Sequence, residues 1–382
     1  MNLRGVRLAH LIESDGPGGA ERMVATLAAS LQTAGADNLV IVPADGEGWL
    51  ARELDGSGVR VESFRFGRPF SPAFARGLGA TLQRNGIALA HSHEFTMAVY
   101  GAWAARRAGI PHLFTMHGSR YYAGRLQRRL AMRVAAAFSG SVVAVSHSLA
   151  QHLSRDLWLR ASRVTMIPNG AALARVAQST LRAELQLEPD DRLALAVGNL
   201  YPVKGHIHLL EALGCLRDQL PRLHVVIAGR GELQTSLEER ARALGVGDRV
   251  HLLGLRSDVA NVLAGADVFV LPSLSEGLPM ALIEAMLAGR PIIATNVGEI
   301  GTVLRGGRDG ILVPPADASA LAQGLARVIS DPALAQRFGA SAALRAEDFS
   351  VAKMMDRYVA LYQALLSPNG RGAQEWLRKA WS

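Results

Sequence analysis

The chain has 382 residues, of which 49% are hydrophobic and 19% charged, and its 41 Lys and Arg against 33 Asp and Glu give a formal net charge of +8. This length accommodates two domains of ordinary size, and the composition excludes a disordered or collagen-like chain. The single cysteine, Cys215, excludes an internal disulfide and is compatible with a reducing cytoplasm. The positive balance suits anionic partners such as nucleotides, although better solubility explains it equally well.

Neither a signal peptide nor a membrane-spanning helix is expected. The apolar run near the start is short and contains Arg7 and His10. The chain contains no uninterrupted apolar stretch of about 18 residues. We therefore expect a cytoplasmic protein.

The first half of the chain alternates short apolar runs with stretches of helical periodicity. Strands are predicted at Val6–Ile12, Leu39–Val42, Leu89–His91, Leu113–His117, Ser141–Val145 and Thr165–Pro168. A glycine-rich loop, Gly16–Gly19, and a helix over Ala20–Thr33 follow the first strand. This rhythm is typical of parallel βαβ units.

The second half repeats the rhythm. Strands are predicted at Leu193–Gly198, His224–Ala228, Arg249–Leu253, Asp267–Leu271, Pro291–Thr295 and Ile311–Val313, with helices at Ser236–Leu244 and Met280–Leu287. Two successive α/β runs predict two Rossmann-like, doubly wound domains, 1–170 and 171–347, with a ligand in a cleft near the carboxyl ends of strands. The segment 348–382 opens with a predicted helix, Val351–Leu366.

The loop between the first strand and the first helix reads Gly16-Pro17-Gly18-Gly19-Ala20-Glu21. Glycines let a backbone approach phosphate closely, and a helix N-terminus offers free N–H groups, so Gly18 and Gly19 are candidates for pyrophosphate contact. The loop matches neither G-x-G-x-x-G nor a Walker sequence. A plain tight turn is the alternative.

Three histidines end apolar runs in the first half. His117 precedes Gly118 at the end of a predicted strand, where it is placed to donate a hydrogen bond to a hydroxyl or phosphate. A buried structural histidine is the alternative. His91 and His93 have the same ambiguity, and their spacing is compatible with a metal, but no cysteine or nearby ligand set supports zinc.

Basic residues follow two strands of the second half. Lys204 lies in a Gly/Pro loop after the first of these strands, where it is placed to neutralise phosphate. A solvated surface lysine is the alternative. Arg230, in Gly229-Arg230-Gly231, is a reserve phosphate contact.

Two carboxylates, Glu276 and Glu284, are separated by seven residues. Glu276 lies in the loop Glu276-Gly277-Leu278-Pro279, and Glu284 lies on the helix that this loop opens. Carboxylates accept hydrogen bonds from hydroxyls, and a sugar nucleotide offers hexose and ribose hydroxyls together. An acid at a helix start and a solvated acid are the alternative.

Two basic segments are candidates for membrane contact. Arg120–Arg133 contains five arginines among Tyr and Leu, and the tail Gln374–Trp381 mixes two tryptophans with Arg and Lys. Either could meet anionic lipid headgroups. A solvated helix face, and packing onto the protein body, are the respective alternatives.

Taken together, these motifs resemble the family-4 retaining glycosyltransferases of the GT-B fold, the bacterial group 1 set, over most of the chain. The landmarks occur in order: Gly18-Gly19-Ala20-Glu21, His117-Gly118, Ile167-Pro168-Asn169-Gly170, Lys204-Gly205, Gly229-Arg230-Gly231, Glu276-Gly277-Leu278-Pro279 with Glu284, and Asp309-Gly310-Ile311-Leu312-Val313-Pro314. The E-x7-E element is the most specific of them.

The resemblance implies that the C-terminal domain binds a nucleotide-diphosphate sugar, UDP- or GDP-linked. Lys204 would hold the diphosphate. Glu276 and the backbone at Gly277 and Leu278 would hold the transferred sugar, and Glu284 the ribose.

The resemblance also assigns roles in the N-terminal domain. Gly18 and Gly19 would close on the phosphates, His117 would contact the sugar or acceptor, and the last helix would return to this domain. No cofactor and no metal are expected, because lysine and N–H groups replace a metal at the leaving group.

Two positions depart from the family pattern. Asn199 stands where an arginine usually helps to clamp the diphosphate, a loss that Arg230 is placed to offset. Val297-Gly298-Glu299 stands where a Gly-Gly pair usually precedes the acid.

The sequence therefore predicts a retaining hexosyltransferase acting on a saccharide or lipid-linked saccharide, at the inner face of the cell membrane. A non-catalytic sugar-nucleotide-binding protein and a dinucleotide-dependent oxidoreductase are the alternatives. Nucleic-acid binding is not expected, because the basic residues lack interleaved aromatics. Lys204→Ala and Glu276→Ala are each expected to abolish turnover with little change in melting temperature.

Overall fold

The computed structural model describes residues 3–16, 18–65, 71–118, 124–174 and 176–367. The chain divides into two compact units. The first comprises Met1–Gly170 together with the chain from Val351, and the second is Ala171–Ser350. The predicted domains end at residues 170 and 347, whereas the two units end at Gly170 and Ser350. The candidate membrane tail, Gln374–Trp381, lies outside the described residues.

In the described part of the first unit, seven parallel strands lie in the order β3-β2-β1-β4-β5-β6-β7. Their bounds are β1 Arg7–Ile12, β2 Asp37–Pro43, β3 Arg60–Phe64, β4 Leu89–His93, β5 His112–Met116, β6 Ser141–Ala144 and β7 Val164–Met166. The central strands are apolar runs because helices cover both faces of the sheet.

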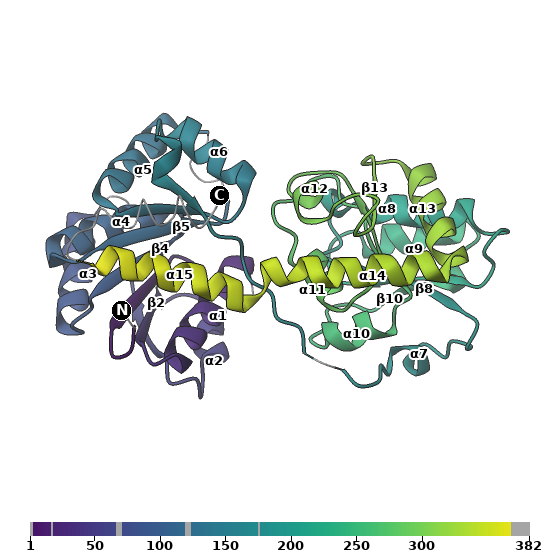
Figure 1. Cartoon of the computed structure of the whole chain (residues 1–382), viewed down its shortest axis with the longest axis horizontal. Helices are drawn as coiled ribbons and strands as arrows, with labels where there is room; N and C mark the ends of the chain where they lie inside the picture. Colours follow the sequence, from purple (N-terminus) through teal and green to yellow (C-terminus); the bar gives the residue numbers. More distant parts are fainter. Residues whose placement is uncertain (1–2, 17, 66–70, 119–123, 175, 368–382) are drawn as a thin grey trace. The chain divides into compact units, whose positions relative to one another are not determined.

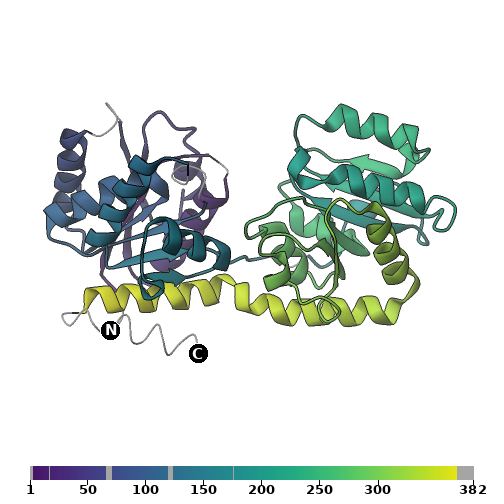
Figure 2. The same ribbon diagram turned by 90° about the horizontal axis from the view of Figure 1, so that it is seen from above.

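The helices of this unit lie on the two faces of the sheet (Figure 1). They are α1 Gly19–Thr33, α2 Trp49–Glu53, α3 Pro72–Arg84, α4 Glu94–Ala108, α5 Leu126–Phe138, α6 His147–Asp156 and α15 Val351–Leu366, with a 3₁₀ turn η1 at Ala161–Arg163. On one face, Leu27 of α1 and Tyr358 of α15 pack against Leu8 of β1. Helices α3 and α4 pack on the other face, and Figure 2 shows α15 running along its side of the sheet.

The strand order of this sheet reverses between β1 and β4, which pair in parallel with His10 opposite His91. Ligands of doubly wound folds bind outside the carboxyl ends of strands at such a switch point. The loop into α1 and the start of α4 both lie there. The fold therefore places Gly18, Gly19 and the end of β4 at the expected ligand edge.

The sequence analysis missed β3. Its five residues, Arg60–Phe64, form the edge of the sheet and pair with β2, with Leu39 opposite Arg60. None of the five is buried, and Arg60 and Glu62 interrupt the apolar pattern. An edge strand with a solvated face carries a weaker apolar signal than a central one.

The described part of the second unit contains a six-stranded parallel sheet of order β10-β9-β8-β11-β12-β13. Its strands are β8 Arg192–Val197, β9 Leu223–Ala228, β10 Val250–Leu252, β11 Val268–Leu271, β12 Ile292–Thr295 and β13 Ile311–Val313. The order reverses between β8 and β11, so the carboxyl ends of these two strands mark the switch point.

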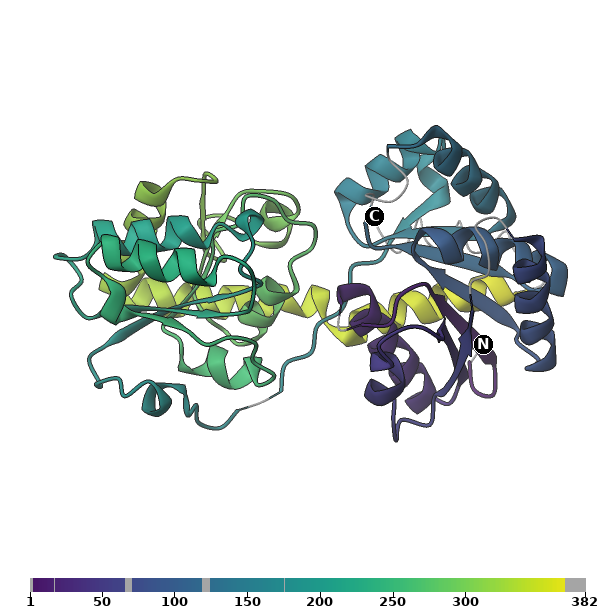
Figure 3. The same ribbon diagram turned by 180° about the vertical axis from the view of Figure 1, so that it is seen from behind.

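Helices again cover both faces of this sheet, as Figure 3 shows from behind. They are α7 Leu181–Glu184, α8 His206–Cys215, α9 Gln234–Ala243, α10 Val259–Gly265, α11 Met280–Leu287, α12 Ile300–Val303, α13 Ala318–Ser330 and α14 Pro332–Ala346, with 3₁₀ turns η2 Pro202–Lys204, η3 Gly247–Arg249 and η4 Glu347–Phe349. Helices α8, α9 and α13 share one core, and α10, α11 and α14 share the other. The predicted helices over Met280–Leu287 and Val351–Leu366 match α11 and α15 at both ends.

Local signals set several helix starts. The Ser71 hydroxyl accepts from the Phe74 N–H ahead of Pro72, and Asp331 caps α14 in the same way ahead of Pro332. Proline is tolerated at the first helical position because its missing N–H is not needed there. No described helix is long and apolar enough to span a bilayer.

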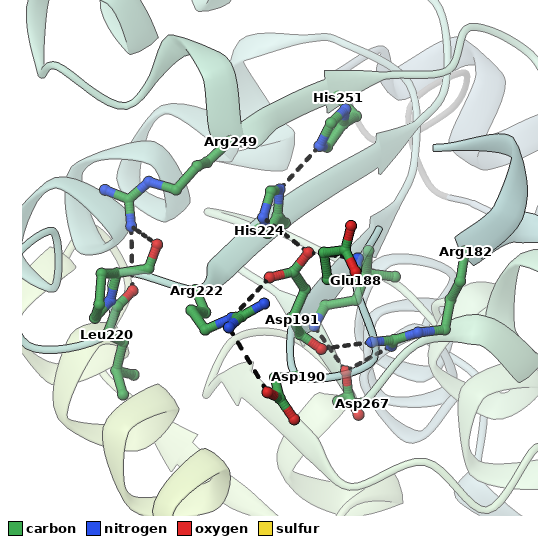
Figure 4. Close-up of polar contacts among 12 residues, drawn as sticks. Arg182, Glu188, Asp190, Asp191, Leu220, Arg222, His224, Arg249, His251 and Asp267 are labelled. Carbon is green, nitrogen blue, oxygen red and sulfur yellow. Dashed lines mark hydrogen bonds and ion pairs between the residues drawn. The ribbon is translucent and has the colours of Figure 1, made fainter. Parts of the chain in front are cut away.

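A polar network fixes the amino ends of the strands of the second sheet (Figure 4). Asp191, next to β8, accepts from Arg222 Nε at 3.1 Å and from the Glu188 N–H at 2.8 Å. Burial alone would raise the pKa of Asp191, but these hydrogen bonds outweigh it, and the pKa is lowered. His224 pairs with His251 at 3.1 Å on the neighbouring strands. Because this network lies at the opposite ends of the strands from the switch point, we interpret it as structural.

Candidate active site

Lys204 and Glu276, 72 residues apart in the chain, meet at the switch point of the second sheet. The Lys204 Nζ donates to Glu276 Oε1 at 2.7 Å, and the Ser273 hydroxyl donates to the same oxygen at 2.6 Å. The side chains of Lys204 and Glu276 are 27% and 8% exposed. The carboxylate is therefore held in place, while the ammonium keeps access to solvent.

Two glycines with positive φ allow the loops to approach so closely. Gly205 has φ +64°, and a Cβ there would lie 2.1 Å from the Pro272 carbonyl oxygen. Gly298 has φ +55°, and a Cβ there would lie 1.8 Å from the Glu276 carbonyl oxygen. Only glycine meets both demands. Gly298, in the segment that departs from the family pattern, thus packs directly on the loop that carries Glu276.

The remaining predicted sugar contacts continue from this loop. Gly277 is exposed and Leu278 half-buried, and α11 begins two residues later at Met280. Glu284 is half-buried in the second turn of α11. The structure thus places Glu276, Gly277, Leu278 and Glu284 on one loop–helix element after β11.

Asn199 and Arg230 are exposed on adjoining loops after β8 and β9. The Leu200 N–H donates to the Arg230 carbonyl at 2.9 Å, and a Cβ on Gly229 would lie 1.9 Å from the Gly198 carbonyl oxygen. The two loops are therefore in backbone contact. Arg230 thus stands on the loop that adjoins the one carrying the neutral Asn199.

In the first unit, Gly18 and Gly19 form the start of the 15-residue helix α1. No side chain caps this end. A Cβ on Gly18 would lie 2.3 Å from a Glu21 carboxylate oxygen, whereas a Cβ on Gly19 would meet nothing within 4 Å. Because the Glu21 carboxylate is the end of a flexible side chain and can move, packing within the unit strictly requires neither glycine.

His117 follows β5 and is half-buried. Its Nε2 lies 3.5 Å from His93 Nδ1, and its Nδ1 has no hydrogen-bond partner among the described residues. Burial lowers the pKa of His117 to about 4, so the imidazole is neutral at pH 7. A neutral imidazole can donate or accept one hydrogen bond at this nitrogen.

His93 and His91 are fully buried on β4, and the structure adds His10 from β1 to them. One nitrogen from each of the three lies within 4.8 Å of the other two. Sequence reasoning missed His10, because only parallel pairing of β1 with β4 brings it opposite His91. In the part of the chain that the structure describes, this is the one group of three or more His, Cys, Asp or Glu that could hold a metal ion.

Glu94 was also missed. It has φ +67°, a conformation that costs a non-glycine residue about 1–3 kcal/mol and is concentrated at functional sites. Burial, followed by the charges of Glu13 and Glu21, raises the pKa of Glu94 to about 8, although a hydrogen bond from the His117 backbone opposes this. A strained acid next to His117 is a candidate for contact with a substrate hydroxyl.

His206, at the first position of α8, is the third residue that the sequence did not single out. It is 3% exposed, and burial lowers its pKa to about 4. It lies close enough to Lys204 and Glu276 for their charges to influence it. Nothing in the motif Lys204-Gly205-His206 alone separates it from a surface histidine.

Sequence models of two families match the chain consecutively. That of Glycosyltransferase Family 4 matches residues 17–175, and that of Glycosyl transferases group 1 matches residues 177–345. The chain belongs to the family-4, group 1 glycosyltransferases. This assignment confirms the resemblance and removes the oxidoreductase alternative.

Among known relatives, this glycosyltransferase is 28% identical over 267 residues to the UDP-Gal:alpha-D-GlcNAc-diphosphoundecaprenol alpha-1,3-galactosyltransferase of Escherichia coli, covering 66% of this chain and 69% of that protein. It is 29% identical over 312 residues to the D-inositol 3-phosphate glycosyltransferase of Rhodococcus opacus, covering 75% of this chain and 70% of that protein. Its fold is similar to that of Anabaena HepE, solved in complex with UDP, with a TM-score of 0.81 at 22% identity over 94% of this chain and 100% of that one. The predicted GT-B class of α/β fold is confirmed.

Proposed function

We propose that this glycosyltransferase is a retaining, metal-independent enzyme that moves a hexosyl group from a UDP-sugar to a lipid-linked saccharide. The observation that carries the proposal is the Lys204–Glu276 pair at the carboxyl ends of β8 and β11. The uracil base and the acceptor class are suggested by the names of relatives, which include a UDP-galactose-dependent enzyme that acts on a diphosphoundecaprenol-linked sugar.

On the donor side, Lys204 would exchange its bond with Glu276 for the diphosphate. The ammonium neutralises charge that develops on the leaving group, which is the principal electrostatic demand of the reaction. Glu276, once released, would accept from the sugar hydroxyls together with the backbone at Gly277 and Leu278. Glu284 would hold the ribose, and Arg230 would add the charge that Asn199 lacks.

On the acceptor side, the open face of Gly19 leaves room for phosphate against the α1 N-terminus. His117 Nδ1 would hydrogen-bond the sugar or the acceptor hydroxyl. Glu94 lies beside it as a second contact for a hydroxyl.

The reaction needs no covalent enzyme intermediate. The bond between the anomeric carbon and the phosphate oxygen breaks, and the acceptor oxygen bonds to that carbon from the same face. The acceptor proton passes to the departing phosphate oxygen, and configuration is retained. Lysine and N–H groups supply the positive charge at the leaving group, and we propose no metal there.

Contact with the membrane would be made by α5. Leu126, Leu130 and Val134 repeat every four residues along it and are 61%, 48% and 54% exposed. A solvated helix face would not carry such a stripe, whereas an interfacial helix would. Arg125 is exposed beside it and suits anionic headgroups.

Two arginines of α5 have another role. Arg129 Nε donates to the Asp156 carbonyl at 2.9 Å, and Arg133 donates to the Leu157 and Trp158 carbonyls at 2.7 Å each. Because these side chains hydrogen-bond the carbonyls at the end of α6, they are less available to bind lipid headgroups. Arg120 lies outside the described residues.

A donor screen tests the catalytic proposal. The chain would be incubated with UDP-, GDP- and ADP-sugars, and the melting temperature and the slow release of nucleoside diphosphate would be measured. A UDP-sugar should raise the melting temperature and be hydrolysed. Binding without any hydrolysis would favour the non-catalytic alternative, for which the neutral Asn199 is the supporting observation, and absence of binding would refute the proposal.

Vesicle sedimentation tests the membrane contact separately. Binding to phosphatidylglycerol vesicles should exceed binding to phosphatidylcholine vesicles and should fall with salt. Leu130→Gln with Val134→Gln should reduce it. Leu344→Gln is the matched control, because Leu344 is 70% exposed on α14 of the second unit. Equal loss in both variants would refute a role for α5.

A further inference from the structure

We propose that His10, His91 and His93 form a buried binding site for a first-row transition metal ion, with Zn²⁺ as the reference ion. The three side chains are 0%, 1% and 0% exposed. They lie within the first unit, between its sheet and the helices α1 and α15. The inference goes beyond the proposed function and does not depend on it.

The spacing of the rings suits a shared ion. A Zn–N bond of about 2.0–2.1 Å in tetrahedral geometry places two ligating nitrogens about 3.4 Å apart and their ring centroids about 5 Å apart. The ring centroids of His10 lie 5.5 Å from His91 and 5.8 Å from His93, close to this spacing. Those of His91 and His93 lie 4.0 Å apart, so these two rings separate by about 1 Å when both bind the ion. The nitrogens all lie within 4.8 Å of one another, so binding an ion brings them closer by up to about 1.4 Å.

Two of the three residues have a nitrogen that nothing in the described chain satisfies. These atoms are His10 Nδ1 and His93 Nε2. Buried polar atoms are satisfied in the great majority of cases, so two unsatisfied nitrogens in one cluster call for a bound water or ion. A cation accounts for both at once, because each neutral imidazole offers it a lone pair.

His91 differs because both of its nitrogens are bonded. Its Nδ1 lies 2.7 Å from the Tyr362 hydroxyl and its Nε2 lies 2.8 Å from the Thr115 hydroxyl. To ligate a metal it releases one of these partners and keeps the other. The bond that remains orients the ring, as the outer hydrogen bond of a metal-bound histidine usually does.

The donor set selects the kind of ion. Three imidazoles with no carboxylate in the cluster suit Zn²⁺, Ni²⁺, Co²⁺ or Cu²⁺ and do not suit Mg²⁺ or Ca²⁺. The half-buried His117, stacked 5.8 Å from His93, marks the end of the cluster that is nearest to solvent. All three ligands of such an ion belong to the first unit, whereas Lys204 belongs to the second.

The test uses the full chain without a histidine tag, stripped with a chelator and dialysed against Zn²⁺. We expect about one zinc ion per chain by elemental analysis. At a free zinc concentration one hundred times Kd, the melting temperature should rise by about 5–10 °C. Bound Co²⁺ should give the visible absorption of a nitrogen-ligated site with four or five ligands. No retained ion and no thermal shift in the wild-type chain would overturn the proposal.

Variants locate the site. His10→Gln and His93→Gln should each weaken zinc binding by at least about tenfold, with folding checked by circular dichroism. His251→Gln is the control, because His251 forms a close histidine pair with His224 in the second unit. Loss of zinc in His251→Gln with retention in the other two variants would refute the assignment. If His10→Gln or His93→Gln does not fold, the wild-type stoichiometry and Co²⁺ spectrum decide.

Discussion

Replacing Lys204 by methionine should damage both turnover and stability, because the lysine partners a nearly buried carboxylate. Glu276 is 8% exposed and accepts from Lys204 and Ser273 through one oxygen. In Lys204→Met only the Ser273 hydroxyl remains. Glu276→Gln instead leaves a neutral amide oxygen for the same donors, and the ammonium, 27% exposed, can turn to water.

The structure sets the magnitudes. A buried ion that loses its partner costs about 3–5 kcal/mol, and the partial exposure of Lys204 reduces this to about 1–3 kcal/mol. At about 2–4 °C per kcal/mol for a unit of this size, Lys204→Met should melt about 2–12 °C lower. Glu276→Gln should stay within about 2 °C. Lys204→Met should lose about 10²–10⁴-fold in turnover, since a contact to developing charge contributes about 3–5 kcal/mol. Glu276→Gln should also lose turnover, because a neutral amide oxygen accepts from the sugar hydroxyls less strongly than a carboxylate does.

The assay is release of nucleoside diphosphate from the donor that the screen identifies, together with thermal melting. Lys353→Met is the matched control, because Lys353 is exposed on α15. This expectation revises the sequence-based one for Lys204, in which stability was unaffected. Full turnover in Lys204→Met would refute the role of the lysine. A Glu276→Gln variant that melts lower than Lys204→Met would refute the energetic reasoning.

Three further outcomes follow from the structure. Gly19→Ala should leave the melting temperature unchanged or higher, because the Cβ meets nothing within 4 Å and alanine favours a helix by about 0.5–1 kcal/mol. The same variant should lower kcat/KM for the donor if phosphate approaches this position. An unchanged kcat/KM would remove Gly19 from the site. Glu94→Gly relieves the φ of +67° but also removes the carboxylate that accepts from the His117 backbone, so the free energy of unfolding should change by less than about 1 kcal/mol while turnover falls. A loss of about 1–3 kcal/mol, the full value expected for that hydrogen bond, would contradict the strain argument. Burial alone would raise the pKa of Asp309, but hydrogen bonds from Arg305 and Ser341 lower it below 3.8. This carboxylate therefore stabilises the fold above about pH 4 and loses that effect as pH falls through its folded pKa. In urea melts, Asp309→Asn should lower the free energy of unfolding by about 1–3 kcal/mol at pH 7 and by less at pH 3, and an equal loss at both would exclude this linkage.

Much of the fold could be predicted because parallel strands carry a strong local signal. Central strands are covered by helices on both faces, so their sequences are apolar runs. The predicted strand Leu193–Gly198 is an example, and it lies close to the observed Arg192–Val197. The edge strand Arg60–Phe64 was missed because solvent reaches one side of it and polar residues interrupt the run. Turn chemistry and apolar periodicity placed Met280–Leu287 and Val351–Leu366 without error at either end.

The candidate site was predictable only where chemistry and local sequence coincide. Glycine- and proline-marked loops, or the helix that follows one, carry Lys204, Glu276 and Glu284. Both the motif and its place after a predicted strand therefore indicated these residues. The bond between Lys204 and Glu276 joins residues 72 apart, and only the pairing of β8 with β11 brings the two loops together. Nothing in the local sequence distinguishes Glu94 or His206, and only their burial in the folded chain singles them out.

The sequence by itself determined two α/β units, the residue types that can bind a sugar diphosphate, and the family. These properties depend on local patterns: apolar runs, turn residues and short motifs in order. Only the tertiary structure decided that Lys204 is paired with Glu276, that Gly19 faces open space, and that His10 joins His91 and His93. Those facts depend on which strands lie side by side, and parallel strands are joined by long crossovers, so neighbours in the sheet are distant in the chain.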